Sequence, residues 1–187
     1  MKNILVINGS ARKGSVSTAL CNAFIEAAEN GFNIKTYNAY KLNAKPCYGC
    51  GYCDKNKGCI NHDLDEFMAD FEAADYFIVS TPVFNGSVPS PLKAIVDRFQ
   101  RYYALRFAHG IKPPVTKPKK AALIITAGSK GEGKENIENM FKQQFTVLNT
   151  TLETVIFVDS TDTVELTDTQ LENAKNKGSK LFLMAGS

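Results

Sequence analysis

Four short apolar runs recur along the chain, each too continuous for a strand with one face in water. They read ILVI, YFIV, ALII and VIFV and lie at 4–7, 76–79, 122–125 and 155–158. Unbroken runs rich in β-branched residues are typical of strands buried on both faces of a parallel sheet. We therefore expect four central parallel strands. A fifth segment, 32–37, partly alternates and suits an edge strand.

Between these runs, apolar residues recur with a spacing near 3.6, which predicts helices. The helical segments lie at 20–28 (ending at Asn30 and Gly31), 64–71, 92–99, 137–148 and 171–183. Basic and aromatic residues extend the third helix beyond Arg101, and an oligomer interface is their plainest role. Alternating strands and helices imply right-handed crossovers. The pattern predicts an α/β fold: a doubly wound five-stranded parallel sheet with helices on both faces.

Composition and charge narrow the class of protein. The chain has 187 residues, 44% of them hydrophobic, so we expect a single domain over 1–187 with one sizeable core. A net charge of +3 is too small for the basic stripe of a nucleic-acid-binding domain. The first residues lack the apolar stretch of a signal peptide, and no run approaches about 18 apolar residues. We expect a cytoplasmic protein with no nucleic-acid or membrane partner.

A segment rich in glycine and hydroxyl side chains follows the first predicted strand. Residues 8–18 read NGSARKGSVST and lead directly into a helix. Backbone N–H groups at a helix N-terminus, short hydroxyls and Arg12 suit a phosphate monoester. The alternative is a glycine turn followed by an ordinary Ser17 N-cap. The segment lacks the G-x-G-x-x-G pattern, which disfavours a dinucleotide site.

Two more loops follow predicted strands and would reach the same edge of the sheet, where ligands bind in such folds. In the first of these, Pro82 fixes the backbone and Phe84, Asn85 and Gly86 form a tip against which a flat ring could lie. The other, TAGSKGEGK at 126–134, could approach the same ligand from the other side.

The 126–134 loop also matches part of the phosphate-binding motif of nucleotide hydrolases. Gly128, Gly133 and Lys134 have the G-x-x-x-x-G-K spacing. Glu135 stands where that motif needs a hydroxyl for magnesium, and its carboxylate would face the phosphates. We therefore disfavour a nucleotide hydrolase.

Four cysteines gather in one segment, the cysteine loop at 44–62. They form a C-x2-C-x2-C-x5-C pattern, with Gly49 and Gly51 between them: Cys47, Cys50, Cys53 and Cys59. Thiols stay reduced in the cytosol, so this cluster favours metal or redox chemistry over structural disulfides. The fifth cysteine, Cys21, lies in an apolar pattern and is expected in the core.

Together, GSARKGSVST, TPVFNGSVPSPLKAIVDR and the cysteine loop resemble the NADPH-dependent FMN reductases of the flavodoxin-like superfamily. The cysteine spacing is similar to that of the iron–sulfur flavoproteins. The resemblance implies a flavodoxin-like sheet that binds FMN. It implies a phosphate loop made of Ser10, Arg12, Ser15, Val16, Ser17 and Thr18. It also implies contacts to the flavin from Pro82, Val83, Phe84, Asn85, Gly86, Ala127, Gly128 and Ser129.

Three explanations of the cysteine loop stay open. A 4Fe-4S cluster suits three cysteines two residues apart and a fourth a few residues later, with Lys45, Lys55 and Lys57 offsetting the thiolate charge. A relative that binds only FMN could retain the cysteines. A zinc ion is the third explanation, although four-cysteine zinc sites usually pair two knuckles across a longer spacer.

The resemblance implies an enzyme that accepts hydride from NAD(P)H on FMN and passes electrons to a small-molecule or protein acceptor. FMN supplies this chemistry, so no catalytic side chain is required. A homodimer or homotetramer is expected. The alternative is a flavodoxin-like electron carrier without enzymatic activity, which the weak charge disfavours because carriers often use strong acidity to dock basic partners. We expect surface or capping roles for His62 and His109, and a structural ion pair or subunit contact at Asp97 and Arg98.

Overall fold

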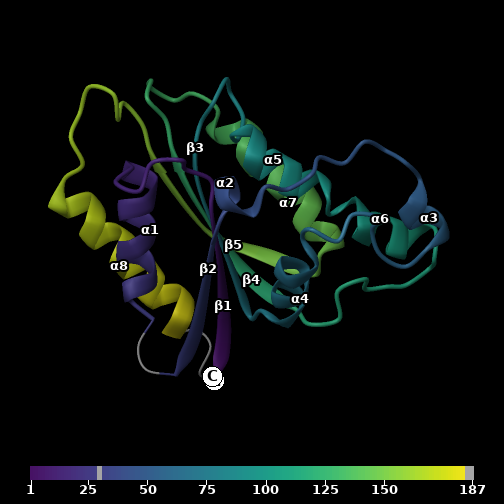
Figure 1. Cartoon of the computed structure of the whole chain (residues 1–187). Helices are drawn as coiled ribbons and strands as arrows, with labels where there is room; N and C mark the ends of the chain where they lie inside the picture. Colours follow the sequence, from purple (N-terminus) through teal and green to yellow (C-terminus); the bar gives the residue numbers. More distant parts are fainter. Residues whose placement is uncertain (29–30, 184–187) are drawn as a thin grey trace.

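Five parallel strands form one sheet in the order β2-β1-β3-β4-β5 (Figure 1). The structure is a computed structural model that describes residues 1–28 and 31–183. The strands are β1 (Lys2–Asn8), β2 (Phe32–Asn38), β3 (Tyr76–Pro82), β4 (Lys119–Thr126) and β5 (Thr150–Val158). This order confirms the predicted doubly wound parallel sheet. The winding direction reverses between β1 and β3, the point at which open α/β sheets bind ligands.

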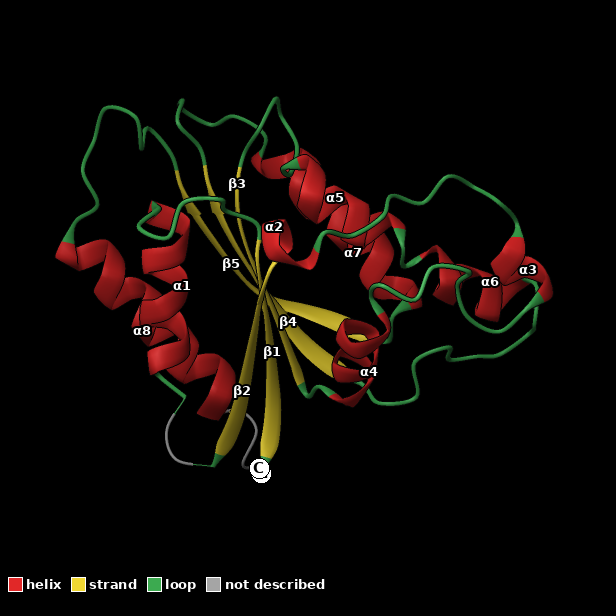
Figure 2. Cartoon of the chain, viewed as in Figure 1, coloured by secondary structure: helices red, strands yellow, loops and turns green. Residues whose placement is uncertain are grey.

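Helices cover both faces of the sheet, as predicted (Figure 2). One face carries α1 (Val16–Glu26) and α8 (Asp168–Leu183). The other side carries α2 (Ala39–Leu42), α3 (Tyr52–Lys55), α4 (Asp65–Ala73), α5 (Ser90–Asp97), α6 (Gln100–Phe107) and α7 (Lys134–Val147). Figure 2 shows α3 and α6 at the end of this layer, furthest from the sheet. No described helix is long and apolar enough to cross a bilayer.

The strand period of two divides the core between these layers. In β1, Ile4 and Val6 pack with α1 and α8, whereas Leu5 and Ile7 pack with the helices of the other face. All four are about 1% exposed, which explains why the run is continuously apolar. Cys21 is buried in the α1–α8 core, as predicted.

Three features of the fold differ most from the sequence prediction. The first helix begins at Val16 and ends at Glu26, and Asn30 lies outside the described residues. The run at 155–158 belongs to an edge strand rather than a central one; its apolar residues are explained by α7 and α8, which contact β5. The helix predicted to run past Arg101 is two helices, because the chain makes a tight turn at Arg98 and Phe99.

Candidate functional site

The first predicted loop links β1 to α1 and is built by hydroxyl groups. The N-cap of α1 is Ser15 rather than Ser17, since Ser15 Oγ accepts a hydrogen bond from Thr18 N at 3.2 Å. Ser15 Oγ also lies 3.1 Å from Ser17 Oγ and 2.8 Å from Thr18 Oγ1. The first turn contains no acidic residue. The positive end of the helix and three hydroxyls therefore meet without a competing carboxylate, which suits an anion.

Two asparagines that the sequence analysis did not select hold this loop in place. Asn8 Oδ1 accepts from Ser10 N at 2.8 Å, and Asn8 Nδ2 donates to Thr18 Oγ1 at 2.8 Å. Asn38 Nδ2 donates to Ser10 O at 2.8 Å. Both asparagines lie at the carboxyl end of a strand. That position is the sequence feature that could have indicated them. Arg12 is exposed on the loop.

The second loop begins at the end of β3 and makes a tight turn. Phe84 and Ser87 exchange backbone hydrogen bonds at 2.8 and 3.0 Å. Between them, Asn85 and Gly86 have φ of 51° and 71°, as a two-residue hairpin turn with two left-handed positions requires. Phe84 stays 48% exposed, so the tip presents an aromatic face at the edge of the sheet.

The second and third loops pack directly against each other. A Cβ at Gly133 would lie 2.5 Å from Val83 Cγ1, so this close approach requires glycine. Val83 N donates to Thr126 O at 2.7 Å, and Asn136 Nδ2 donates to Gly86 O at 3.3 Å. The two loops therefore form one continuous wall.

The third loop is supported from behind by the loop that follows β5. Ala127 N donates to Val158 O at 2.9 Å, and Thr161 N donates back to Ala127 O at 3.1 Å. A Cβ at Gly128 would overlap the Asp162 carboxylate. Asp162 is an acidic residue of this edge that the sequence analysis did not select.

The first and second loops are joined through Ser80 at the end of β3. Ser80 Oγ donates to Ser17 O at 2.8 Å, and Ser80 O accepts from Gly9 N at 2.7 Å. The structure thus brings all three predicted loops to the carboxyl edge of the sheet at the β1/β3 reversal.

The cysteine loop lies elsewhere, at the α3 and α6 end of the helical layer (Figure 1). All four cysteines line one cavity of about 380 Å³. Gly49 and Gly51 have φ of 67° and 68°, so they allow left-handed turns beside the thiols. Among the described residues, no three His, Cys, Asp or Glu side chains are close enough together to hold a metal ion. Burial raises the pKa of the Cys53 thiol, and the negative charge of Asp54 raises it further.

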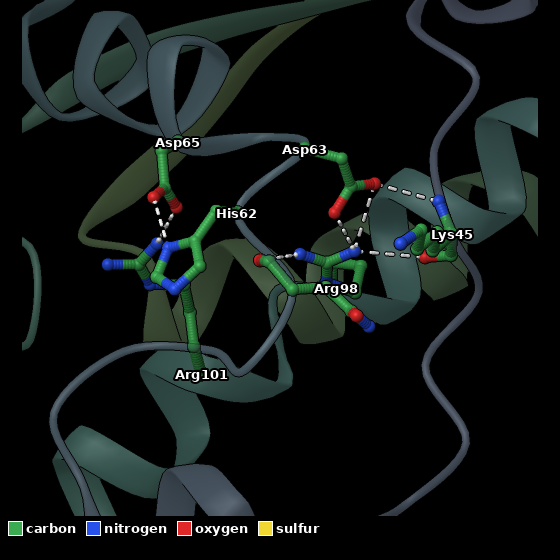
Figure 3. Close-up of polar contacts among 7 residues, drawn as sticks. Lys45, His62, Asp63, Asp65, Arg98 and Arg101 are labelled. Atoms are coloured by element: carbon green, nitrogen blue, oxygen red, sulfur yellow. Dashed lines mark hydrogen bonds and ion pairs between the residues drawn. The ribbon is translucent and has the colours of Figure 1, made fainter.

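Arginines rather than lysines are the cations that line this cavity, namely Arg98 and Arg101. Lys57 lines a neighbouring depression. The Arg98 side chain is 3% exposed and pairs with Asp63 at 2.9 Å (Figure 3). Burial alone would raise the pKa of Asp63, but hydrogen bonds from Lys45 N and Arg98 hold it below its ordinary value. The sequence predicted a structural ion pair or subunit contact at Asp97 and Arg98, and the structure pairs Arg98 with Asp63 rather than with Asp97.

The remaining candidates have structural contacts. His62 Nδ1 lies 2.7 Å from Asp65 Oδ2 on the surface, and His109 Nε2 lies 2.9 Å from Cys53 O. Asp97 pairs with Lys93 on the same helix at 2.6 Å. These contacts agree with the predicted surface, capping and ion-pair roles.

A parallel sheet of this strand order, with three ligand-type loops at its reversal point, defines a flavodoxin-like α/β protein. Residues 2–160 match the family described as NADPH-dependent FMN reductase. The chain belongs to this family.

Two relatives and one solved structure are similar to this chain, the structure in its fold. An iron–sulfur flavoprotein of Methanosarcina thermophila is 35% identical over 131 residues, which cover 69% of this chain and 65% of that protein. An iron–sulfur flavoprotein of Archaeoglobus fulgidus is 34% identical over 96 residues, or 51% of this chain and 49% of that protein. The chain thus spans between about half and two thirds of these relatives. A solved flavone reductase superposes with a TM-score of 0.72 at 18% identity, over 98% of this chain and 62% of that one, and so shares the fold.

Proposed function

We propose that the chain is an NAD(P)H-dependent flavin oxidoreductase that binds FMN between the loops after β1, β3 and β4. The observation that carries the proposal is the Ser15-capped N-terminus of α1, where three hydroxyls meet the positive end of a helix whose first turn contains no acidic residue. Membership of the NADPH-dependent FMN reductase family supports it. When bound, FMN would supply hydride acceptance from the nicotinamide and release of single electrons.

The residues of the chain would bind and orient this cofactor rather than take part in proton transfer. Ser10, Arg12, Ser15, Val16, Ser17 and Thr18 would hold its phosphate through hydroxyls, backbone N–H groups and the guanidinium. The Phe84–Gly86 tip and the backbone of Ala127, Gly128 and Ser129 would flank the ring. The close packing of Gly133 against Val83 and Gly86 would hold the tip and the third loop together as one wall of the site.

Anaerobic reduction tests the activity. Protein loaded with FMN is mixed with NADPH or NADH, and the visible flavin absorbance is followed. If the protein is an enzyme, the flavin absorbance bleaches rapidly, and NAD(P)H is consumed continuously once an acceptor is added. An electron carrier of the flavodoxin kind would retain FMN but bleach no faster than free FMN, and that result would overturn the proposed activity.

The phosphate loop gives a first mutational prediction. Removing the guanidinium in Arg12→Ala should raise the FMN dissociation constant about 10- to 100-fold, since a charge-assisted hydrogen bond contributes roughly 1.5–3 kcal/mol. Lys13→Ala, which removes the next cation of the same exposed loop, is the matched control and should change it less than threefold. Quenching of FMN fluorescence measures the dissociation constants of both variants. Equal losses of FMN affinity in the two variants would indicate a general effect of charge and would contradict a specific contact between Arg12 and the phosphate.

We further propose that the cysteine loop holds a 4Fe-4S cluster, which would be the next one-electron acceptor. Two observations support the proposal: the four thiols line one cavity, and relatives with about one third identity are named iron–sulfur flavoproteins. The thiols would have to draw closer together around the cluster, since no three of the described side chains are close enough to hold a metal ion as they stand. Iron and acid-labile sulfide analysis of anaerobically purified protein tests it. About four irons and four sulfides per chain are expected, and flavin absorbance alone, with no iron or with zinc, would refute it.

A further inference from the structure

Arg98 connects the two ends of the cysteine loop. Its Nη1 donates to Asp63 Oδ1 at 2.9 Å and to Lys45 O at 3.0 Å, and its Nη2 donates to Asn61 O at 2.6 Å (Figure 3). Lys45 lies two residues before Cys47, whereas Asn61 lies two residues after Cys59. A single buried guanidinium therefore closes the loop that carries all four thiols.

Two hydrogen-bond donors of the arginines that line the cavity have no acceptor. The Nε atoms of Arg98 and Arg101 are buried and lack a partner among the residues that the structure describes. Both arginines line the cavity together with the cysteines. The rest of the Arg101 side chain is 20% exposed, and its Nη1 reaches Asp65 only at 3.9 Å. Buried donors are almost always paired in native proteins, but these Nε atoms have almost no accessible surface. The two guanidinium charges are therefore what the arginines can offer to a group bound in the cavity.

We propose that Arg98 and Arg101 stabilise the cysteine-bound cluster: Arg98 closes the loop around it, and both arginines place a guanidinium charge beside it. This inference rests on the cluster proposed above. Four thiolates make the loaded cavity anionic, and reduction adds a further negative charge. Neighbouring guanidinium groups stabilise the reduced form more than the oxidised one, because hydrogen bonds and charge near the sulfurs set the potential of such clusters. The two arginines would thus raise the reduction potential and help retain the cluster.

Arg101 gives the sharper test because it does not close the loop. Arg101→Gln, Arg101→Lys and the control Arg106→Gln are purified anaerobically, and the cluster potential is measured by a redox titration followed by electron paramagnetic resonance. Arg106 lies on the same helix but does not line the cavity. Arg101→Gln should disfavour reduction at least tenfold, a shift of 59 mV to more negative potential for one electron. Arg101→Lys should shift less, because it keeps the charge, and Arg106→Gln should match the unmodified protein.

Arg98 is tested by retention of the cluster. A lysine keeps the charge but presents one ammonium in place of a fork. Arg98→Lys should therefore lose iron to a chelator at least tenfold faster than Arg106→Gln. FMN binding and far-ultraviolet circular dichroism verify that this variant is folded. Unchanged iron retention would overturn the clamping role.

The outcomes separate this inference from the function on which it rests. If the unmodified protein contains no iron and sulfide, the cluster proposal fails and this inference fails with it. If the unmodified protein is loaded but Arg101→Gln has the same potential as Arg106→Gln, the cluster stands and the role of Arg101 is refuted.

Discussion

Lys119 lies where a charged side chain is costly. It opens β4, is 3% exposed, and its ammonium lies 4.9 Å from the centre of the Phe71 ring. Its Nζ donates to Lys117 O at 3.1 Å and, more weakly, to the backbone of Glu72 and Ala74. Burial, aided by repulsion from Lys117, lowers the pKa of Lys119 from 10.5 to about 8. The folded protein therefore binds this proton less tightly than the unfolded chain does.

This pKa predicts how stability depends on pH. Below pH 8 both states are protonated and the folded state carries the full penalty of a buried charge. Between pH 8 and 10.5 the unfolded chain binds more protons, so the free energy of unfolding rises with pH through this group. In Lys119→Met that rise should be absent. Between pH 8 and 10.5 the free energy of unfolding of the unmodified protein should therefore increase relative to that of the variant by up to about 3 kcal/mol. Urea unfolding at several pH values measures it.

The neighbouring Lys120 provides the control for this measurement. Lys120 is only partly buried, and Lys120→Met should keep the pH dependence of the unmodified protein. If Lys119→Met keeps it as well, Lys119 is not the group responsible.

At the scale of elements, the backbones of α1 and α8 approach each other closely at Gly178. A Cβ at Gly178 would lie 2.1 Å from the backbone oxygen of Phe24 and 3.1 Å from Ala27 Cβ. A backbone atom inside a helix cannot rotate away as a flexible side chain can. The spacing of the two helices is therefore set by the missing side chain, and the rings of Phe24 and Phe182 pack edge to face beside it.

Gly178→Ala should force these helices apart. We expect the free energy of unfolding to fall by roughly 1–3 kcal/mol, as for other overpacked cores, although alanine favours a helix over glycine by about 1 kcal/mol. The control is Gly14→Ala, where a Cβ would meet nothing within 4 Å and stability should change little. Chemical denaturation compares them. A Gly178→Ala protein as stable as Gly14→Ala would show that the helices can separate at no cost.

For the whole molecule, the three ligand loops and the cysteine cavity occupy different places. The loops lie at the carboxyl edge of the sheet, and the cavity lies by α3 and α6 (Figure 1). Binding at one should therefore not require the other. In Cys50→Ser, iron content should fall while the FMN dissociation constant stays within twofold, as measured by fluorescence quenching. A tenfold loss of FMN affinity would instead indicate that the two sites are coupled.

Much of this fold follows from the sequence, because continuous apolar runs and helical spacing depend on local burial. The parallel sheet, its two helical layers and the placement of three loops were predicted from those patterns. The edge position of β5 was not, since an apolar run records cover by helices on both faces rather than the number of neighbouring strands. The break at Arg98 was missed because the apolar spacing continues across it.

The polar contacts of the two candidate sites were harder to predict. Asn38 reaches the first loop from another strand, and Arg98 meets Asp63 across 35 positions. Such pairs depend on how elements pack, which a single sequence does not display. By contrast, glycine-rich turns and cysteine spacing are local features. They indicated the segments that the structure places at the carboxyl edge of the sheet and around the cysteine cavity.

One helix joins the regions of both candidate sites. Helix α5 starts at Ser90, just after the Phe84 turn, and Arg98 follows its last residue. Its eight residues span about 12 Å. The helix therefore sets the distance between the Phe84 turn and the arginine that closes the cysteine loop. One inserted residue would rotate Arg98 by about 100° about the helix axis and remove its hydrogen bonds to the cysteine loop, so the closure of that loop depends on the length of this helix.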